Sequence, residues 1–146
     1  MTTVNTNINF VPDGYKPIVH SAPYGALIGP VYERVDEEDS VRAFRVKKQH
    51  TNSLGYLHGG MLMSFADIVL AQAVIRTGRG LTATVRMVTE FMAPGRLGDW
   101  VEGRASVSKS TGTLLFAEGQ FQVGASLIMI ASGVFVVPSD RNIKSE

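Results

Sequence analysis

The longest apolar stretch of the chain begins at Gly59 and ends at about Thr77, with no proline inside it and no glycine after its first two residues. Its Ala, Leu and Met residues favour a helix, and Gly78 and Gly80 supply a stop. The stretch is too long for a typical strand and too short to span a membrane. It predicts a helix that is apolar nearly all round, which is typical of a helix buried at the centre of a domain.

Segments on both sides of this helix have the patterns of β-strands. Residues 101–107 alternate between apolar and polar side chains, as a half-buried antiparallel strand requires. The predicted strands are residues 27–36, 40–48, 81–92, 100–109, 114–123 and 126–137. The connections between them are short, including a polar turn at residues 36–39, and short connections favour antiparallel pairing. We therefore predict an α+β fold with one antiparallel sheet wrapped around a long central helix.

The sequence predicts one domain flanked by a segment at each end. Its 146 residues are close to the usual size of a single domain, which we place at residues 27–137. Residues 1–26 contain several Pro and Gly and show no clean periodicity, so we expect an irregular arm with room for one short helical turn. Residues 138–146 form a polar tail.

Charge and composition exclude several classes of function. The net charge is +1 and the basic residues are spread along the chain, so we expect neither nucleic-acid nor membrane binding. The chain has no Cys, which excludes disulfides, a thiolate nucleophile and Cys-bound metals. Imidazole could come only from His20, His50 and His58, and we expect no metal site. We see no secretory signal and expect a soluble, cytoplasmic protein.

Asp67 is the one charged residue in the first four turns of the predicted helix. A carboxylate in apolar surroundings is costly unless it has a partner, so Asp67 either lies on an exposed stripe with Ser64 and Gln72 or serves a function. Gly59 and Gly60 stand at the helix start, where free N–H groups and the positive end of the dipole bind anionic oxygen. Because Gly60 precedes Asp67 by seven residues, the two share one helix face.

These residues lie within a larger pattern. The segment Asn52-Ser53-Leu54-Gly55-Tyr56-Leu57-His58-Gly59-Gly60, with Asp67 seven residues on, is followed by Thr82-Ala83-Thr84-Val85 and Phe91-Met92-Ala93-Pro94-Gly95. It resembles the hotdog-fold acyl-CoA thioesterases of the PaaI-like group, which includes 4-hydroxybenzoyl-CoA and phenylacetyl-CoA thioesterases. The resemblance covers residues 49–137. It implies hydrolysis of an acyl-CoA thioester to a free acid and CoA, without a cofactor.

The resemblance also implies roles for individual residues. Asp67 matches the catalytic base or nucleophile, and Gly60 matches the backbone N–H that polarises the thioester carbonyl. Asn52 and His58 match residues that hold the water or thioester and order the loop. Thr84 matches a hydroxyl that reaches the site of a neighbouring subunit. Substrate or CoA binding is expected at Gly59, Ser64, Phe91, Met92, Ala93, Pro94, Gly95, Arg96, Lys109, Ser110, Thr111, Gly112, Thr113 and Leu114.

Two further expectations concern class and assembly. The alternative to an enzyme is a hotdog module that binds acyl-CoA without cleaving it, as a sensor or interaction protein. A hydratase would need a His and a carboxylate on facing elements, a requirement that His58 and Asp67 do not clearly meet. A strand at residues 81–92 would leave an open sheet edge, so we expect a homodimer or a dimer of dimers with shared sites.

Overall fold

A computed structural model describes residues 7–19, 22–36 and 40–138. The strands are β1 (Lys16–Pro17), β2 (Val31–Val35), β3 (Ser40–Arg45), β4 (Ala83–Phe91), β5 (Trp100–Ser110), β6 (Leu114–Val123) and β7 (Ser126–Val136). The helices are α1 (Pro23–Ile28), the 3₁₀ turn η1 (Lys48–His50), α2 (Gly59–Val74) and the π-helical turn η2 (Ile75–Arg79). His20, the predicted turn from residue 37 to 39 and the tail from residue 139 lie outside the described residues.

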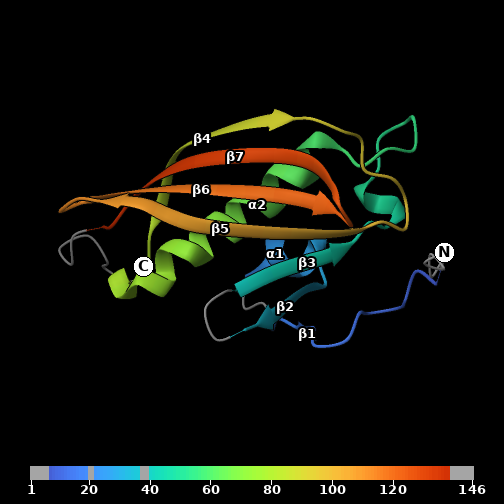
Figure 1. Cartoon of the computed structure of the whole chain (residues 1–146), viewed down its shortest axis with the longest axis horizontal. Helices are drawn as coiled ribbons and strands as arrows, with labels where there is room; N and C mark the ends of the chain where they lie inside the picture. Colours follow the sequence, from blue (N-terminus) through green and yellow to red (C-terminus); the bar gives the residue numbers. More distant parts are fainter. Residues whose placement is uncertain (1–6, 20–21, 37–39, 139–146) are drawn as a thin grey trace.

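The seven strands form one antiparallel sheet in the order β1-β2-β3-β5-β6-β7-β4. Helix α2 lies along one face of this sheet and packs against β4, β5, β6 and β7 (Figure 1). The chain leaves α2 and enters β4, which pairs with β7 and stands at the edge of the sheet. The predicted α+β architecture, one antiparallel sheet around a central helix, is confirmed.

The core lies between α2 and the sheet. Phe65 of α2 stacks edge-on against Phe44 of β3 and Phe121 of β6, with ring centroids 4.7 and 5.8 Å apart. On β6 the buried positions alternate with exposed ones, as predicted for a strand with one face on the core. The segment Gly59–Arg79 is apolar enough, by length and composition, to cross a membrane. Here it is the helix that the sheet packs against, and core helices pass the same test.

Gly103 lies where the sheet approaches α2 most closely. A Cβ at this position would stand 2.7 Å from Cε1 of Phe121 and 3.0 Å from Cγ2 of Val69. We expect Gly103→Ala to lower the free energy of unfolding by about 1–3 kcal/mol, because the added methyl overfills the core. Urea unfolding measures this, with Gly112→Ala, which meets nothing within 4 Å, as the matched control. An equal, small effect of both variants would contradict the expectation.

Some predicted boundaries were wrong for local reasons. Residues 27–30 are not a strand, because residues 23–28 form α1, with Pro23 in the first turn, and Gly29-Pro30 then separates the helix from β2. Strand β3 ends at Arg45, three residues early, and η1 follows. The regular helix ends at Val74, and the π-helical turn carries the chain to Gly78, which has a φ of 81°.

The N-terminal arm is attached to the sheet by specific contacts. Tyr15 donates from its hydroxyl to Oε1 of Glu102 at 2.5 Å, and its ring packs edge-on against Trp100. Burial, followed by the neighbouring Glu102 carboxylate, raises the pKa of the Tyr15 hydroxyl above its ordinary value. Nη2 of Arg45 donates to the carbonyl of Phe10. These contacts hold the arm against the strands that cover the core.

Candidate active site

The start of α2 has one N–H group already in use. His58 is the N-cap, in an extended conformation, and its Nδ1 accepts from the N–H of Gly60 at 2.8 Å. Among the described residues none accepts from the N–H of Gly59. We expected Gly60 to supply the donor to the thioester carbonyl; in this structure its N–H bonds to His58, whereas the N–H of Gly59 has no acceptor among the described residues. Spacing alone does not separate the two, because the difference depends on the direction of the His58 ring.

The loop before α2 is organised by Asn52. Its Oδ1 accepts from the N–H groups of Leu54 and Tyr56 at 2.9 and 3.1 Å, and its own N–H donates to the carbonyl of Tyr56. Gly55 completes the turn with a φ of 81°, a value that glycine adopts without strain. Asn52 therefore shapes the loop that places His58 at the helix start, and its side-chain Oδ1 is occupied by these two hydrogen bonds.

Asp67 lies two turns further along α2 and is half-buried. Thr84 of β4 donates from Oγ1 to Oδ1 of Asp67 at 2.6 Å. Both residues belong to the same chain, and the expectation that Thr84 also reaches the site of a neighbouring subunit stays a prediction. No ion pair to Asp67 occurs within the described segments. The carboxylate thus keeps one hydroxyl partner and no cation, so Oδ2 stays available for chemistry.

The other polar side chains of this helix are engaged elsewhere. Oγ of Ser64 donates to the carbonyl of Gly60 at 2.9 Å and lies 2.6 Å from the hydroxyl of Tyr24. Because the single Ser64 proton is used, Tyr24 is the donor of the second bond. Gln72 accepts from Arg42 at 2.7 Å. Ser64 thus joins α1 to α2, and its expected contact with substrate stays a prediction.

Strand β4 runs beside α2 and contacts both ends of the candidate site. At one end is Thr84, bonded to Asp67, and at the other is Phe91, whose Cζ would lie 3.3 Å from a Cβ on Gly59. Eight residues separate Gly59 from Asp67, which is about 12 Å along a helix axis. Within one chain, the free N–H and the carboxylate therefore lie on the same helix about two turns apart, not at one point.

The segment 91–96 lies at the start of α2. Leu57 donates from its N–H to the carbonyl of Gly95 at 2.8 Å, and Tyr56 forms an isolated bridge with Arg96. The Arg96 guanidinium stands 5.3 Å from the centroid of the Tyr56 ring. This segment, predicted for CoA binding, therefore does lie beside Gly59.

The segment 109–114 lies at the opposite end of α2. Arg79 donates to the carbonyls of Thr111 and Gly112 and to Oγ of Ser110, which fastens this turn to the π-helical turn after α2. A 16-residue helix is about 24 Å long. Within one chain, the two segments predicted for CoA binding therefore lie at opposite ends of α2, separated by the length of that helix.

His50 is buried next to the site and makes two hydrogen bonds. Its Nδ1 accepts from the N–H of Lys47 at 3.0 Å, and Nε2 lies 2.8 Å from the carbonyl of Ile28. This pattern fits the neutral tautomer that carries its proton on Nε2. Burial lowers the pKa of the His50 imidazole below its ordinary value.

Acid is therefore expected to destabilise the fold through His50. Above about pH 6.5, the imidazole is neutral in both states and the stability is complete. As the pH falls below that value, the unfolded state binds a proton before the folded one, so the free energy of unfolding decreases until the lower folded-state pKa is passed. Urea unfolding at pH 7.5 and pH 5 measures the loss. His50→Gln should show a smaller loss, and an identical loss in the variant would refute this assignment.

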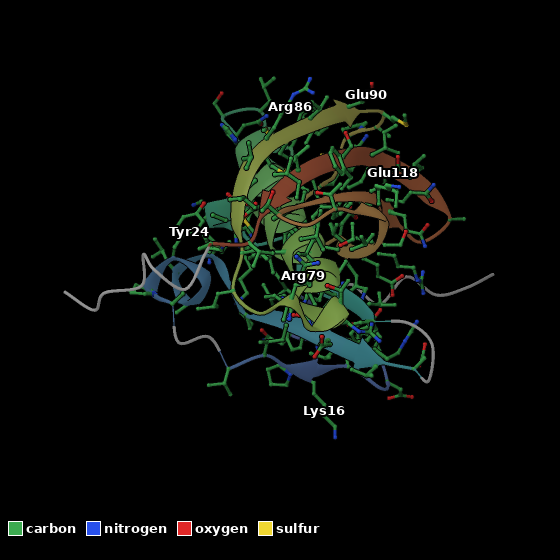
Figure 2. All side chains as sticks on the ribbon, turned by 90° about the vertical axis from the view of Figure 1, so that its left-hand side faces the viewer. Lys16, Tyr24, Arg79, Arg86, Glu90 and Glu118 are labelled. Atoms are coloured by element: carbon green, nitrogen blue, oxygen red, sulfur yellow. The ribbon has the colours of Figure 1, made fainter. Side chains whose placement is uncertain are left out.

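Two cavities border these elements. One of about 380 Å³ lies beside His58 and Met61 of the helix start and is walled by Tyr24 and Leu27 of α1. The other, about 650 Å³, is lined by residues of β4, β5, β6 and β7, among them Glu90 and Glu118, which lie on the side of the sheet away from α2 (Figure 2). The described residues contain no cluster of three or more His, Asp or Glu that could hold a metal.

Tyr24 and Leu27 were missed by the sequence prediction. They lie in a six-residue helix, which is too short for a periodic signal. The sequence did carry one signal for this helix. A Pro stands at its first position and the Gly29-Pro30 pair follows its end, and these residues mark the two boundaries of a short helix.

Comparison with known proteins places the chain among thioesterases. The family model of the Thioesterase superfamily matches residues 54–124. A Pseudomonas aeruginosa protein named "Putative esterase PA0474" is 36% identical over 131 residues, which are 88% of this chain and 98% of that protein. Mouse acyl-coenzyme A thioesterase 13 is 32% identical over 97 residues, 66% of this chain and 69% of that protein. The crystal structure of zebrafish thioesterase superfamily member 2 matches with a TM-score of 0.74 and 26% identity, covering 81% of this chain and 89% of that one.

Proposed function

The chain belongs to the thioesterase superfamily and is a thioester hydrolase, and from this premise we propose that its substrates are acyl-CoA thioesters, which it cleaves to a free acid and CoA. The family resemblance predicted from residues 52–67 is thereby confirmed. One observation carries the proposal for the site: the Asp67 carboxylate, held by Thr84 and free of any cation within the described residues, lies on the helix whose first N–H is unused.

The N–H of Gly59 is the proposed donor to the thioester carbonyl. It points from the first turn of α2, where the helix dipole and the unpaired N–H groups favour negative charge. The carbonyl oxygen becomes an oxyanion when the tetrahedral intermediate forms, so the interaction strengthens as the reaction proceeds. A preorganised donor of this kind contributes roughly 3 kcal/mol to transition-state stabilisation.

Asp67 is the proposed base or nucleophile. As a base, it takes a proton from water while the water oxygen bonds to the acyl carbon, and collapse of the intermediate breaks the C–S bond and releases the CoA thiolate, which takes up the proton. As a nucleophile, it bonds to the acyl carbon itself while the C–S bond breaks and the CoA thiolate leaves. Water then cleaves the resulting anhydride, which gives the free acid, restores the Asp67 carboxylate and supplies the proton that the thiolate takes up. In either route Thr84 fixes the direction of the carboxylate, so Thr84 is a positioning residue.

The site is proposed to need two copies of the chain. A donor on the carbonyl oxygen and a carboxylate attacking the carbon lie within about 7 Å of one another, counting a hydrogen bond, a C=O bond and an attack distance. Gly59 and Asp67 of one chain are about 12 Å apart along the helix. The separation of residues 91–96 from residues 109–114 along α2 supports the same conclusion, because the second copy can supply the missing end.

The proposed contact between copies is the open edge of β4. This strand pairs with β7 on one side, and no described strand covers its other side. It exposes Val85 and Phe91 there, and an uncovered apolar edge favours pairing with another chain. A two-fold arrangement at β4 would bring the start of one α2 toward Asp67 of the other. We therefore propose a homodimer as the smallest active unit.

Thiol release from acyl-CoA by the purified protein tests this function. The proposed reaction uses only water as co-reactant, so release is expected without any added cofactor, with the free acid formed in equal amount. A protein that only binds acyl-CoA would show saturable binding and no release. That result would favour the acyl-CoA-binding module over the enzyme.

A further inference from the structure

The cavity of about 380 Å³ beside the start of α2 is lined by apolar and polar side chains. Its apolar surface comes from Leu27, Ile28 and Met61, and its polar groups come from Tyr24, Gln49, Thr51 and the two imidazoles of His50 and His58. Among the described residues that line it there is no Asp, Glu, Lys or Arg. Its volume falls within the range of small-molecule pockets. Gly59, Asp67 and Thr84 do not line this cavity, and neither does any residue of β4.

The cavity borders the candidate site at His58. The same side chain that lines the cavity caps the N–H of Gly60 and stands one residue before Gly59, the proposed donor to the carbonyl. A group attached to that carbonyl can therefore extend past His58 into the cavity. Met61, in the first turn of α2, forms the inner wall beside it.

Helix α1 is the outer wall and is fixed at two points. Tyr24 donates to Ser64 at 2.6 Å, and the carbonyl of Ile28 lies 2.8 Å from Nε2 of His50. Figure 2 shows Tyr24 at the side of the molecule where α1 lies. Between these two points Leu27 borders the cavity while remaining 74% exposed, so its side chain can change without unpacking the core.

We propose that this cavity holds the acyl chain of the substrate, with α1 as its outer wall and Leu27 as a residue that sets the permitted chain length. The inference rests on the proposed function and adds the substrate class, an uncharged apolar acyl group. An acyl group with a terminal carboxylate is disfavoured, because no cation lines the cavity and a buried unpaired carboxylate is costly. A chain too short to reach Leu27 does not sense this residue.

The experiment compares kcat/KM for acetyl-, hexanoyl-, decanoyl- and glutaryl-CoA. Wild type is expected to prefer hexanoyl- or decanoyl-CoA to glutaryl-CoA. Leu27→Trp, which narrows the cavity, is expected to lower kcat/KM for decanoyl-CoA by about tenfold or more, mainly through KM, and to leave acetyl-CoA within about twofold. Leu27→Arg, which adds a cation, is expected to raise kcat/KM for glutaryl-CoA relative to decanoyl-CoA.

The matched control is Val35→Trp, at another exposed apolar position, the last residue of β2. It should leave the chain-length profile unchanged. A chain-length profile of Leu27→Trp that matches wild type, in a protein that still releases thiol, overturns the acyl-cavity proposal alone. Absence of thiol release from every substrate by wild type overturns the proposed function instead, so the two failures are distinguishable.

Discussion

Asp67→Asn is expected to lower kcat for thiol release by about 10²- to 10⁴-fold, the usual contribution of a positioned base. The amide keeps the size of the side chain and can still accept from Thr84, but it can neither take a proton from water nor attack the acyl carbon. Because Asp67 is only half-buried and makes no ion pair within the described residues, the melting temperature should change little. Thiol-release assays measure kcat, and thermal unfolding measures the melting temperature.

Glu118→Gln is the matched control for this substitution. It also replaces a carboxylate by an amide, but on the sheet face that is turned away from α2 (Figure 2). Its kcat should stay within about twofold of wild type, as is usual for surface substitutions. If Asp67→Asn retained the turnover of Glu118→Gln, the carboxylate would have no part in the reaction, and the proposed site would have to be abandoned.

Gly59→Pro is expected to lower kcat/KM by about 10²- to 10³-fold, because proline has no N–H to donate to the oxyanion. The structure makes this substitution unusually specific. Gly59 is the first residue of α2, where proline is favoured, and His58 before it has φ −65° and ψ 133°, an extended conformation that a following proline accepts. The helix should therefore form as before.

Gly59→Ala provides the control, since it keeps the N–H and adds the same Cβ near Phe91. A Cβ there lies 3.3 Å from Cζ of Phe91, so both variants require the ring to move slightly. The alanine variant should retain most of the activity, and the difference between the two isolates the hydrogen bond. Equal losses in both would mean that crowding at Phe91, not the missing donor, limits the reaction.

The same two variants report whether one site is built from two chains. When Asp67→Asn and Gly59→Pro subunits exchange freely, half of the dimers are mixed, and each mixed dimer has one site with both groups intact. About a quarter of wild-type activity should then reappear from two inactive proteins. Each chain supplying its own site would give no recovery.

The fold was predictable where a long periodic signal existed. The apolar run of α2 and the alternation along β5 and β6 determine which side chains are buried. Burial of these apolar side chains fixes the orientation of each element, and the pattern therefore predicts it. Helix α1 lacked such a signal, and its place was decided by the bonds of Tyr24 and Ile28 to other elements. Tertiary contacts of this kind are not encoded in local periodicity.

The candidate site was predictable in its members but not in its connections. The motif named Asp67, His58 and the glycine pair, yet the ring of His58 decides which glycine keeps its N–H, and the register of β4 against β7 decides which residue meets Asp67. Rotamer and register are set by packing, and neither is visible in residue spacing.

Strand β4 is an edge strand of the sheet and also borders the candidate site, with Thr84 bonded to Asp67 at one end and Phe91 beside Gly59 at the other. If two copies pair at β4 as proposed, activity depends on protein concentration: as the protein is diluted below the dissociation constant of the β4 contact, activity per subunit should decline even though each subunit stays folded. Cellular abundance would then control thioester cleavage through the strand whose Thr84 orients the Asp67 carboxylate.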